Sequence, residues 1–180
     1  MNICVFCGSS SGNDAVYSNA AKELAACLVK TKSSLIYGGA KIGLMGILAD
    51  EVIARGGIVT GVIPEFLVNL EVGHTGITQL EIVSTMHERK RRMAELADAF
   101  IAMPGGWGTL DELAEILTWK QLKLIHEPVG LLNVNSFFAS LLSQMSKMTD
   151  EGFLRPENLE EIKVSDNPQH LLTLLGVNQI

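Results

Sequence analysis

A glutamate that follows a glycine-rich turn is the strongest candidate for chemistry in this 180-residue chain. Residues Pro104 to Glu112 (PGGWGTLDE) come after an apolar run, Ala99 to Met103, and before a run with helical periodicity. Closely spaced glycines let a backbone approach a ligand, and the free N–H groups at the start of the next helix bind anions, most often phosphate. Glu112 would then place a carboxylate beside a bound phosphate.

Two simpler interpretations of this segment stay open at the level of sequence. Thr109 to Glu112 matches the capping box Thr-x-x-Glu, in which a hydroxyl and a carboxylate only satisfy free backbone N–H groups. A glycine turn is also common wherever a strand passes tightly into a helix. Under either interpretation Glu112 would have no chemical role.

Arginine and lysine are concentrated in one stretch, Met86 to Met93 (MHERKRRM). At about 100° per residue on a helix, Met86 and Met93 share the apolar stripe. Arg89 and Lys90 border that stripe, so they can reach a crevice at the strand ends, whereas Arg91 points to solvent. An arginine in such a crevice can bind a phosphate or orient a carboxylate with its planar guanidinium.

Two further glycine-rich segments follow expected strands, Gly8 to Gly12 and Gly38 to Gly46. The second is neither G-x-G-x-x-G nor a P-loop, so a dinucleotide or triphosphate site is poorly supported. In open parallel sheets, ligands bind at the carboxyl ends of the strands where the winding reverses. We therefore expect both segments and the Pro104 to Glu112 turn to converge on one site; close packing of helix on strand is the alternative for the second.

The elements that must position these residues alternate between short apolar runs and amphipathic runs of helical length. This pattern predicts one α/β domain over residues 1–180: a doubly wound, Rossmann-like, mostly parallel sheet of about seven strands with helices on both faces. The expected strands are Asn2 to Cys7, Ser34 to Tyr37, Ile58 to Ile63, Gln79 to Val83, Ala99 to Met103, Val129 to Asn133 and Ile162 to Val164. The expected helices are Ala15 to Thr31, Gly43 to Arg55, Met86 to Ala97, Thr109 to Leu122, Ser136 to Met148 and Pro168 to Leu175; the stretches Pro64 to Thr78 and Asp150 to Asn158 are expected to be irregular.

Composition narrows the class of protein. A net charge of −6 argues against nucleic acid and anionic lipid as partners, and no apolar stretch is long enough to span a bilayer, so we expect a cytoplasmic protein. Cys4 and Cys7 are spaced as C-x-x-C, but on a strand they point to opposite faces, which favours buried free thiols. His87-Glu88 is not part of an H-E-x-x-H motif because residue 91 is arginine, so we expect no metal site.

With these residues in view, the chain resembles the Lonely Guy family of cytokinin riboside 5′-monophosphate phosphoribohydrolases, whose bacterial members were long labelled possible lysine decarboxylases. Two departures stand out: Ala40 replaces a glycine and Trp107 a tyrosine that many members have. The matching segments are Gly8-Ser9-Ser10, Tyr37-Gly38-Gly39, Gly43-Leu44-Met45-Gly46, Met86-His87-x-Arg89-Lys90-x-x-Met93, Pro104-Gly105-Gly106-x-Gly108-Thr109-x-x-Glu112, Thr118-Trp119 and Pro128-Val129-Gly130-Leu131-Leu132-Asn133.

The resemblance implies that Arg89 and Glu112 are the catalytic pair and that no cofactor is needed. Glu71 is assigned through a less specific match than the others. Together with the glycine loops, the expected substrate-binding residues are Gly8, Ser9, Gly38, Gly39, Glu71, Arg89, Lys90, Gly105, Gly106, Trp107, Gly108, Thr109, Leu110, Asp111, Glu112 and Thr118.

The implied reaction is hydrolysis of the N-glycosidic bond of an adenosine 5′-monophosphate, often N6-substituted, to free base and ribose 5-phosphate. Bond breaking develops positive charge on the ribose, which a carboxylate can stabilise. We expect the helix start to keep Glu112 ionised, which favours an electrostatic or base role. The resemblance also implies a homodimer with its site close to the interface, where Leu113, Ile116, Leu117 and Leu122 offer apolar surface unless they simply pack on the sheet.

Three alternatives remain. The enzyme could be a general nucleosidase of AMP and other nucleoside monophosphates. A lysine decarboxylase would need pyridoxal phosphate on a lysine, for which only Lys41, Lys90 and Lys120 suggest themselves. A non-catalytic nucleotide or cofactor carrier, like the molybdenum-cofactor carriers, would share the fold without the reaction.

Overall fold

A single sheet of seven parallel strands forms the centre of the computed structural model, which describes residues 1–70 and 72–177. The strand order is β4-β3-β2-β1-β5-β6-β7. The central strands are fully buried, as their uninterrupted apolar runs require when helices cover both faces. The strands are β1 Asn2–Phe6, β2 Ser34–Tyr37, β3 Val59–Pro64, β4 Gln79–Val83, β5 Ala99–Ala102, β6 Val129–Leu132 and β7 Lys163–Ser165.

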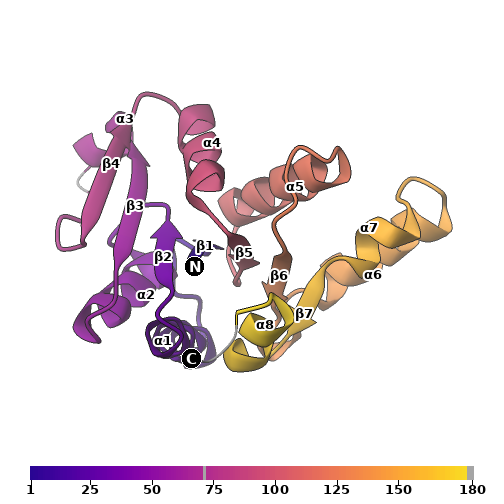
Figure 1. The fold of residues 1–180 in the computed structure, drawn as a ribbon, viewed down its shortest axis with the longest axis horizontal. Helices are drawn as coiled ribbons and strands as arrows, with labels where there is room; N and C mark the ends of the chain where they lie inside the picture. Colours follow the sequence, from indigo (N-terminus) through magenta and orange to yellow (C-terminus); the bar gives the residue numbers. More distant parts are fainter. Residues whose placement is uncertain (71, 178–180) are drawn as a thin grey trace.

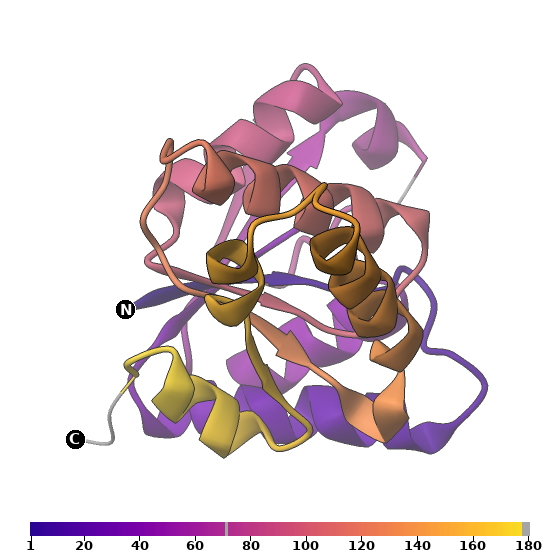
Figure 2. The same ribbon diagram turned by 90° about the vertical axis from the view of Figure 1, so that its right-hand side faces the viewer.

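Helices cover the two faces of the sheet in separate groups (Figures 1 and 2). One face packs against α1, α2 and α8, and the other against α4, α5 and the start of α6. The doubly wound α/β architecture predicted from the sequence is thereby confirmed. The helices are α1 Ala15–Lys30, α2 Gly43–Ala54, α3 Glu65–Asn69, α4 Met86–Leu96, α5 Trp107–Gln121, α6 Ala139–Asp150, α7 Pro156–Glu160 and α8 Pro168–Leu174, with the 3-10 turn η1 Val134–Ser136 before α6.

The winding of the chain reverses between β1 and β5. From β1 the chain builds outward through β2, β3 and β4, and then α4 returns it to the other side of β1, where β5, β6 and β7 follow. The loops after β1 and β5 therefore diverge at this point, and they are tied together by a hydrogen bond from the Gly8 N–H to the Pro104 carbonyl (3.1 Å). This is the place where the fold leaves room for a ligand.

The structure corrects several boundaries expected from the sequence. The stretch Pro64 to Thr78 contains α3, and the stretch Asp150 to Asn158 contains the start of α7. The helix expected from Ser136 begins at Ala139, because Asn135 and Ser136 take positive φ angles of 50° and 57° in a turn before it. Short one-turn helices carry too little periodicity to be seen in the sequence.

The two cysteines of the C-x-x-C pattern behave as expected for residues three apart on a strand. Cys4 packs in the core between the sheet and α4–α5, and Cys7 packs on the opposite side with α1 and α2. Both thiols are buried and free. A shared metal or a disulfide is therefore not formed by this pair.

Candidate active site

Loops from three strand ends surround one cavity of about 330 Å³. The loops after β1, β2 and β5 each contribute, so the convergence expected from the glycine segments is confirmed. The cavity opens between α2 and α3 on one side and the start of α5 on the other. Its lining residues are Cys7, Ser9, Gly38, Ala40, Ile42, Met45, Leu67, Val72, Arg89, Gly106, Trp107, Gly108, Thr109 and Glu112.

Arg89 reaches the cavity from α4 and is held by backbone carbonyls. Its Nε donates to the Val62 carbonyl (3.1 Å) and its Nη2 donates to the Gly38 carbonyl (3.3 Å). The residue is only 8% exposed, so these bonds are made away from bulk water. A Cβ at position 38 would overlap the guanidinium, which explains why glycine stands there.

Glu112 lies opposite Arg89 on the second turn of α5, with 3.5 Å between its Oε1 and the arginine Nη2. The carboxyl is 7% exposed. Burial raises its pKa from 4.5 to about 7, although the Arg89 guanidinium acts in the opposite direction. The expectation that the helix start keeps Glu112 ionised is therefore wrong near neutral pH, where a carboxyl with this pKa is only partly ionised because burial penalises its charge.

The start of α5 also differs from the capping-box interpretation. The N-cap is Gly106 and the helix begins at Trp107, so Thr109 lies inside the first turn rather than at the cap. Thr109 is buried, and its side chain occupies the space that a Cβ on Gly105 would need. The first N–H groups of α5, from Trp107 to Thr109, are thus left at the cavity wall, where they can bind an anion.

Lys90 and Arg91 follow Arg89 on α4, but neither lines the cavity. Arg91 is 69% exposed and pairs with Glu95, as expected of the solvated face of the helix. Lys90 was expected to reach the crevice, but its Nζ pairs instead with Asp111 (3.0 Å) and Glu115 (3.1 Å) on α5. This pairing fixes α4 against α5, the two helices that carry Arg89 and Glu112.

The remaining expected residues are dispersed around the cavity. Gly39, Leu110 and Asp111 do not belong to its lining. Thr118 is exposed on a different face of α5, where its hydroxyl donates to the Ala114 carbonyl (2.7 Å) and lines an apolar groove with α6. Glu71 lies outside the described residues.

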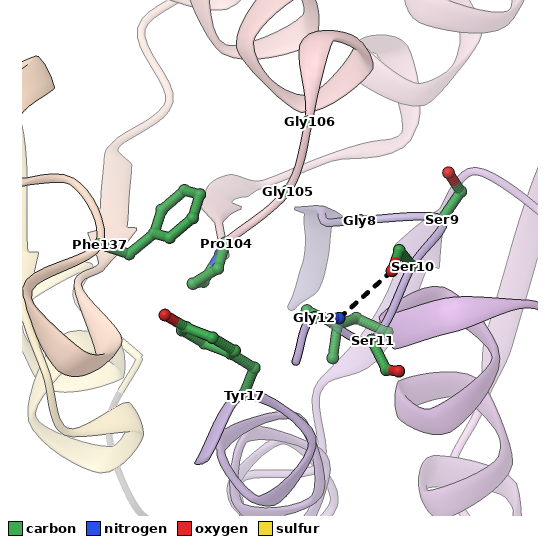
Figure 3. Close-up of a pocket in the computed structure, with 11 residues that line it drawn as sticks. Gly8, Ser9, Ser10, Ser11, Gly12, Tyr17, Pro104, Gly105, Gly106 and Phe137 are labelled. Carbon is green, nitrogen blue, oxygen red and sulfur yellow. Dashed lines mark hydrogen bonds between the residues drawn. The ribbon is translucent and has the colours of Figure 1, made fainter. Parts of the chain in front are cut away.

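A second, smaller cavity of about 210 Å³ adjoins the first and shares Ser9 and Gly106 with it (Figure 3). In it the rings of Tyr17 and Phe137 meet edge to face beside Pro104, with centroids 6.0 Å apart. The other side is backbone and serine: Gly8, Ser9, Ser10, Ser11, Gly12, Gly105 and Gly106, with Leu44 at the base. The expected residues Gly8 and Gly105 belong to this cavity rather than to the one with Arg89.

Sequence reasoning did not name the apolar part of the cavity lining. Ile42, Met45, Leu67 and Val72 form it, and they come from the β2–α2 loop, α2 and the region after β3. Leu67 and Val72 fall in the stretch that was expected to be irregular. Ile42 and Met45 lie within the Gly38 to Gly46 segment that was expected to converge on the site, but they were not named as site residues.

The described residues bear on two other kinds of site, a metal site and a lysine that could carry pyridoxal phosphate. Among them, no group of three or more His, Cys, Asp or Glu side chains could hold a metal ion. No lysine lines the cavity, and within the same residues Lys120 pairs with Glu161 at the far end of α5. No helix in the described part of the chain is long and apolar enough to cross a membrane.

Comparison with known proteins places this arrangement in a family. Residues 45–175 match the family model described as "Possible lysine decarboxylase". The chain is 48% identical to cytokinin riboside 5′-monophosphate phosphoribohydrolase LOG2 of Arabidopsis thaliana, over 96% of this chain and 81% of the relative. It is 49% identical to LOG1 of the same plant, over 86% of this chain and 72% of the relative.

The solved structures extend the similarity of fold. The molybdenum cofactor binding protein of Rippkaea orientalis superposes with a TM-score of 0.74 at 20% identity, over 97% of this chain and 94% of that one. At this identity the similarity establishes the fold alone, whereas the plant relatives are similar along almost the whole chain. The chain belongs to the Lonely Guy family of cytokinin riboside 5′-monophosphate phosphoribohydrolases.

Proposed function

We propose that this protein hydrolyses the N-glycosidic bond of adenosine 5′-monophosphates, N6-substituted ones such as cytokinin riboside 5′-monophosphates included, and releases the base and ribose 5-phosphate. The observation that carries the proposal is the buried Arg89–Glu112 pair, 3.5 Å apart, beside the free N–H groups of α5. The names of the plant relatives supply the substrate class.

The start of α5 would hold the 5′-phosphate. Gly106, Gly108 and Thr109 line the cavity there, and N–H groups at a helix start bind anions without any cationic side chain. Glu112 lies within two turns of these groups on the same helix. Phosphate binding would therefore fix the ribose over the carboxylate and use binding energy for orientation.

Glu112 would act on the sugar. As the bond to the base lengthens, positive charge develops on the ribose, and the ionised carboxylate stabilises it and accepts a proton from the attacking water. The base leaves with a proton taken from solvent, and Glu112 returns its own proton to solvent. Arg89, fixed by the Val62 and Gly38 carbonyls, would hold the carboxylate in place and contact the substrate. A carboxyl with a pKa of about 7 changes charge near neutral pH, which suits proton transfer.

The apolar part of the lining suits the base. Ile42, Met45, Leu67 and Val72 add apolar surface to the lining of the cavity, and an adenine with an apolar N6 substituent would bury its edge against such a surface. This feature favours substituted adenines over pyrimidines.

The deciding experiment is chromatography of products from a panel of nucleoside monophosphates. The panel contains AMP, N6-isopentenyl-AMP, GMP and CMP, with each matching nucleoside as control. We expect free base from the adenine nucleotides and none from the nucleosides, since these lack the phosphate. Recovery of every nucleotide intact would overturn the proposal and favour a carrier; bound pyridoxal phosphate, seen as an aldimine absorbance, would favour a decarboxylase.

We further propose that the single domain of residues 1–180 acts in the cytoplasm as a homodimer. Leu113 and Ile116 are buried against the sheet, so they are not available to a partner subunit. Leu122 is 60% exposed and Trp107 is 88% exposed at the two ends of α5, and these side chains offer apolar surface for the dimer interface. Thr118 lies outside the cavity of its own chain, so the partner subunit's Thr118 would be the one that reaches the substrate.

Light scattering at micromolar concentration tests the assembly. We expect a dimer whose activity falls on dilution below the dissociation constant, and a fully active monomer would contradict it. Cell fractionation tests the compartment.

A further inference from the structure

A short segment that follows α3 is fastened across the loop between β2 and α2. In this segment, which we call the strap (Val72–Gly76), the Val72 carbonyl accepts from the Lys41 N–H (2.8 Å) and the His74 N–H donates to the Gly39 carbonyl (2.8 Å). The two bonds flank an antiparallel bridge between Ala40 and Gly73. The strap therefore forms the outer layer over the Gly39–Lys41 backbone.

The side chain of His74 fastens the strap a second time, through both ring nitrogens. Nδ1 accepts from the Gly76 N–H (3.1 Å), so the ring proton sits on Nε2 and faces Asp50 Oδ1 of α2 at 3.0 Å. His74 is 9% exposed, whereas the Asp50 side chain is 71% exposed. One imidazole thus joins the turn of the strap to the helix that carries Met45 of the cavity wall.

The strap and the loop beneath it both reach the active site. Val72 lines the same cavity as Glu112, and the carbonyl of Gly38, next to the Gly39 that His74 contacts, accepts from the Arg89 guanidinium. A shift of the strap would therefore move Val72, which is part of the cavity lining. It would also move the Gly38 carbonyl that accepts from Arg89, because Gly38 is joined by one peptide unit to the Gly39 that His74 contacts. Neither His74 nor Asp50 lines the cavity, so neither is placed to touch a substrate.

We propose that His74 and Asp50 are positioning residues that fix the base-binding wall and the carbonyl support of Arg89. The inference rests on the proposed nucleotide hydrolysis for its kinetic readout, and on the strap alone for its structural readout. A partly exposed hydrogen bond adds little to global stability, so the His74–Asp50 contact matters for the position of the strap rather than for folding.

The two bonds of His74 can be removed one at a time. Asparagine at position 74 can accept the Gly76 N–H through an Asx turn but cannot reach Asp50. Glutamine can extend an amide N–H towards Asp50 but does not form that turn. Asp50→Asn keeps the acceptor oxygen for Nε2 and removes only the charge.

We expect His74→Ala to raise KM by roughly tenfold, as loss of two hydrogen bonds would, while kcat changes less than about threefold. His74→Asn and His74→Gln should each recover part of the loss, and Asp50→Asn should resemble wild type while Asp50→Ala does not. The matched control is His170→Asn, which removes a comparable ring-nitrogen bond, to Ser165 Oγ at 3.2 Å, near β7 at the opposite edge of the sheet. This control should leave KM unchanged.

Amide hydrogen exchange gives a readout that needs no activity. The Lys41 and His74 amides should exchange slowly in wild type and at least tenfold faster in His74→Ala, at a melting temperature close to that of wild type. Unchanged exchange, or an unchanged KM, would overturn the positioning role. If wild type hydrolyses no nucleotide, the proposed function fails, and the exchange data alone decide whether His74 fastens the strap.

Discussion

The two adjoining cavities both include residues of the loops after β1 and β5, yet they differ in chemistry. The larger contains a buried arginine and a buried glutamate, and the smaller contains an aromatic pair, serines and glycine backbone. They share Ser9 and Gly106. The fold therefore provides the space on both sides of the divergence, and the side chains of α4 and α5 decide which side can break a bond.

Of the substitutions that test this difference between the cavities, Glu112→Gln should have the largest effect on catalysis. The substitution keeps size and removes charge at the reacting centre, so we expect kcat to fall by roughly three orders of magnitude while nucleotide binding stays within a few-fold. Single-turnover kinetics and calorimetric titration with AMP measure the two quantities. If kcat of Glu112→Gln stays within a few-fold of wild type, Glu112 does not give the larger cavity its catalytic chemistry, and the proposed difference between the two cavities is wrong.

The same substitution should stabilise the protein in a pH-dependent way. Because the pKa of Glu112 is about 7 in the folded state and 4.5 when unperturbed, the folded state retains a proton that the unfolded state loses, and stability falls as pH rises between these values. Above pH 7, Glu112→Gln should therefore raise the free energy of unfolding by up to about 3 kcal/mol, and below pH 4.5 by nothing. Urea unfolding at pH 5 and pH 8 measures this, with exposed Glu95→Gln as the control that should show no such difference.

Arg89→Ala and Arg91→Ala compare the contributions of two arginines on α4 to catalysis. Arg89 is buried on the Val62 and Gly38 carbonyls beside Glu112, so its loss should lower kcat/KM by about 100-fold. Arg91 is 69% exposed, and its loss should change kcat/KM by less than about twofold. Steady-state kinetics on both variants suffice; equal losses would mean that the helix acts only as a diffuse positive field.

The pH dependence of kcat/KM reports which form of Glu112 is active. If the carboxylate is required, the rate should rise with pH to a plateau and lie about tenfold below it at pH 6, one unit below the pKa of about 7. A fall above pH 7 would instead assign Glu112 as a general acid. Binding of AMP to Glu112→Gln over the same range corrects for ionisation of the substrate phosphate.

The sequence predicted the frame of this site well and its interior poorly. The β2 and β4 bounds agree with the structure, and Arg89 reaches the crevice and Arg91 the solvent as their helical positions predicted, because periodicity is a local property of the chain. The pKa of Glu112 depends on burial by loops from three distant strands, which no local pattern encodes. Lys90 was misplaced for the same reason: its partners on α5 are tertiary.

Capping shows how one local pattern can be ambiguous. Thr-x-x-Glu occurs at Thr85–Glu88 as well as at Thr109–Glu112. In the structure Thr85 caps α4 by accepting the Glu88 N–H (3.1 Å), and the Glu88 carboxylate accepts from the Ser84 N–H. At α5 the helix starts earlier, at Trp107, because Gly106 turns the chain and Thr109 packs under Gly105. Only packing distinguishes a capping glutamate from one that is free for chemistry.

The smallest expected effect tests the second cavity. Tyr17→Leu removes the edge-to-face contact with Phe137, and Tyr17 does not line the cavity that contains Arg89 and Glu112. We expect the free energy of unfolding to fall by about 1 kcal/mol, the typical worth of such an aromatic pair, and kcat to stay within about threefold. Urea unfolding and steady-state kinetics on AMP measure both. A loss of kcat beyond tenfold without a matching loss of stability would show that the aromatic cavity takes part in the reaction, and that the divergence of β1 and β5 forms one extended site rather than two.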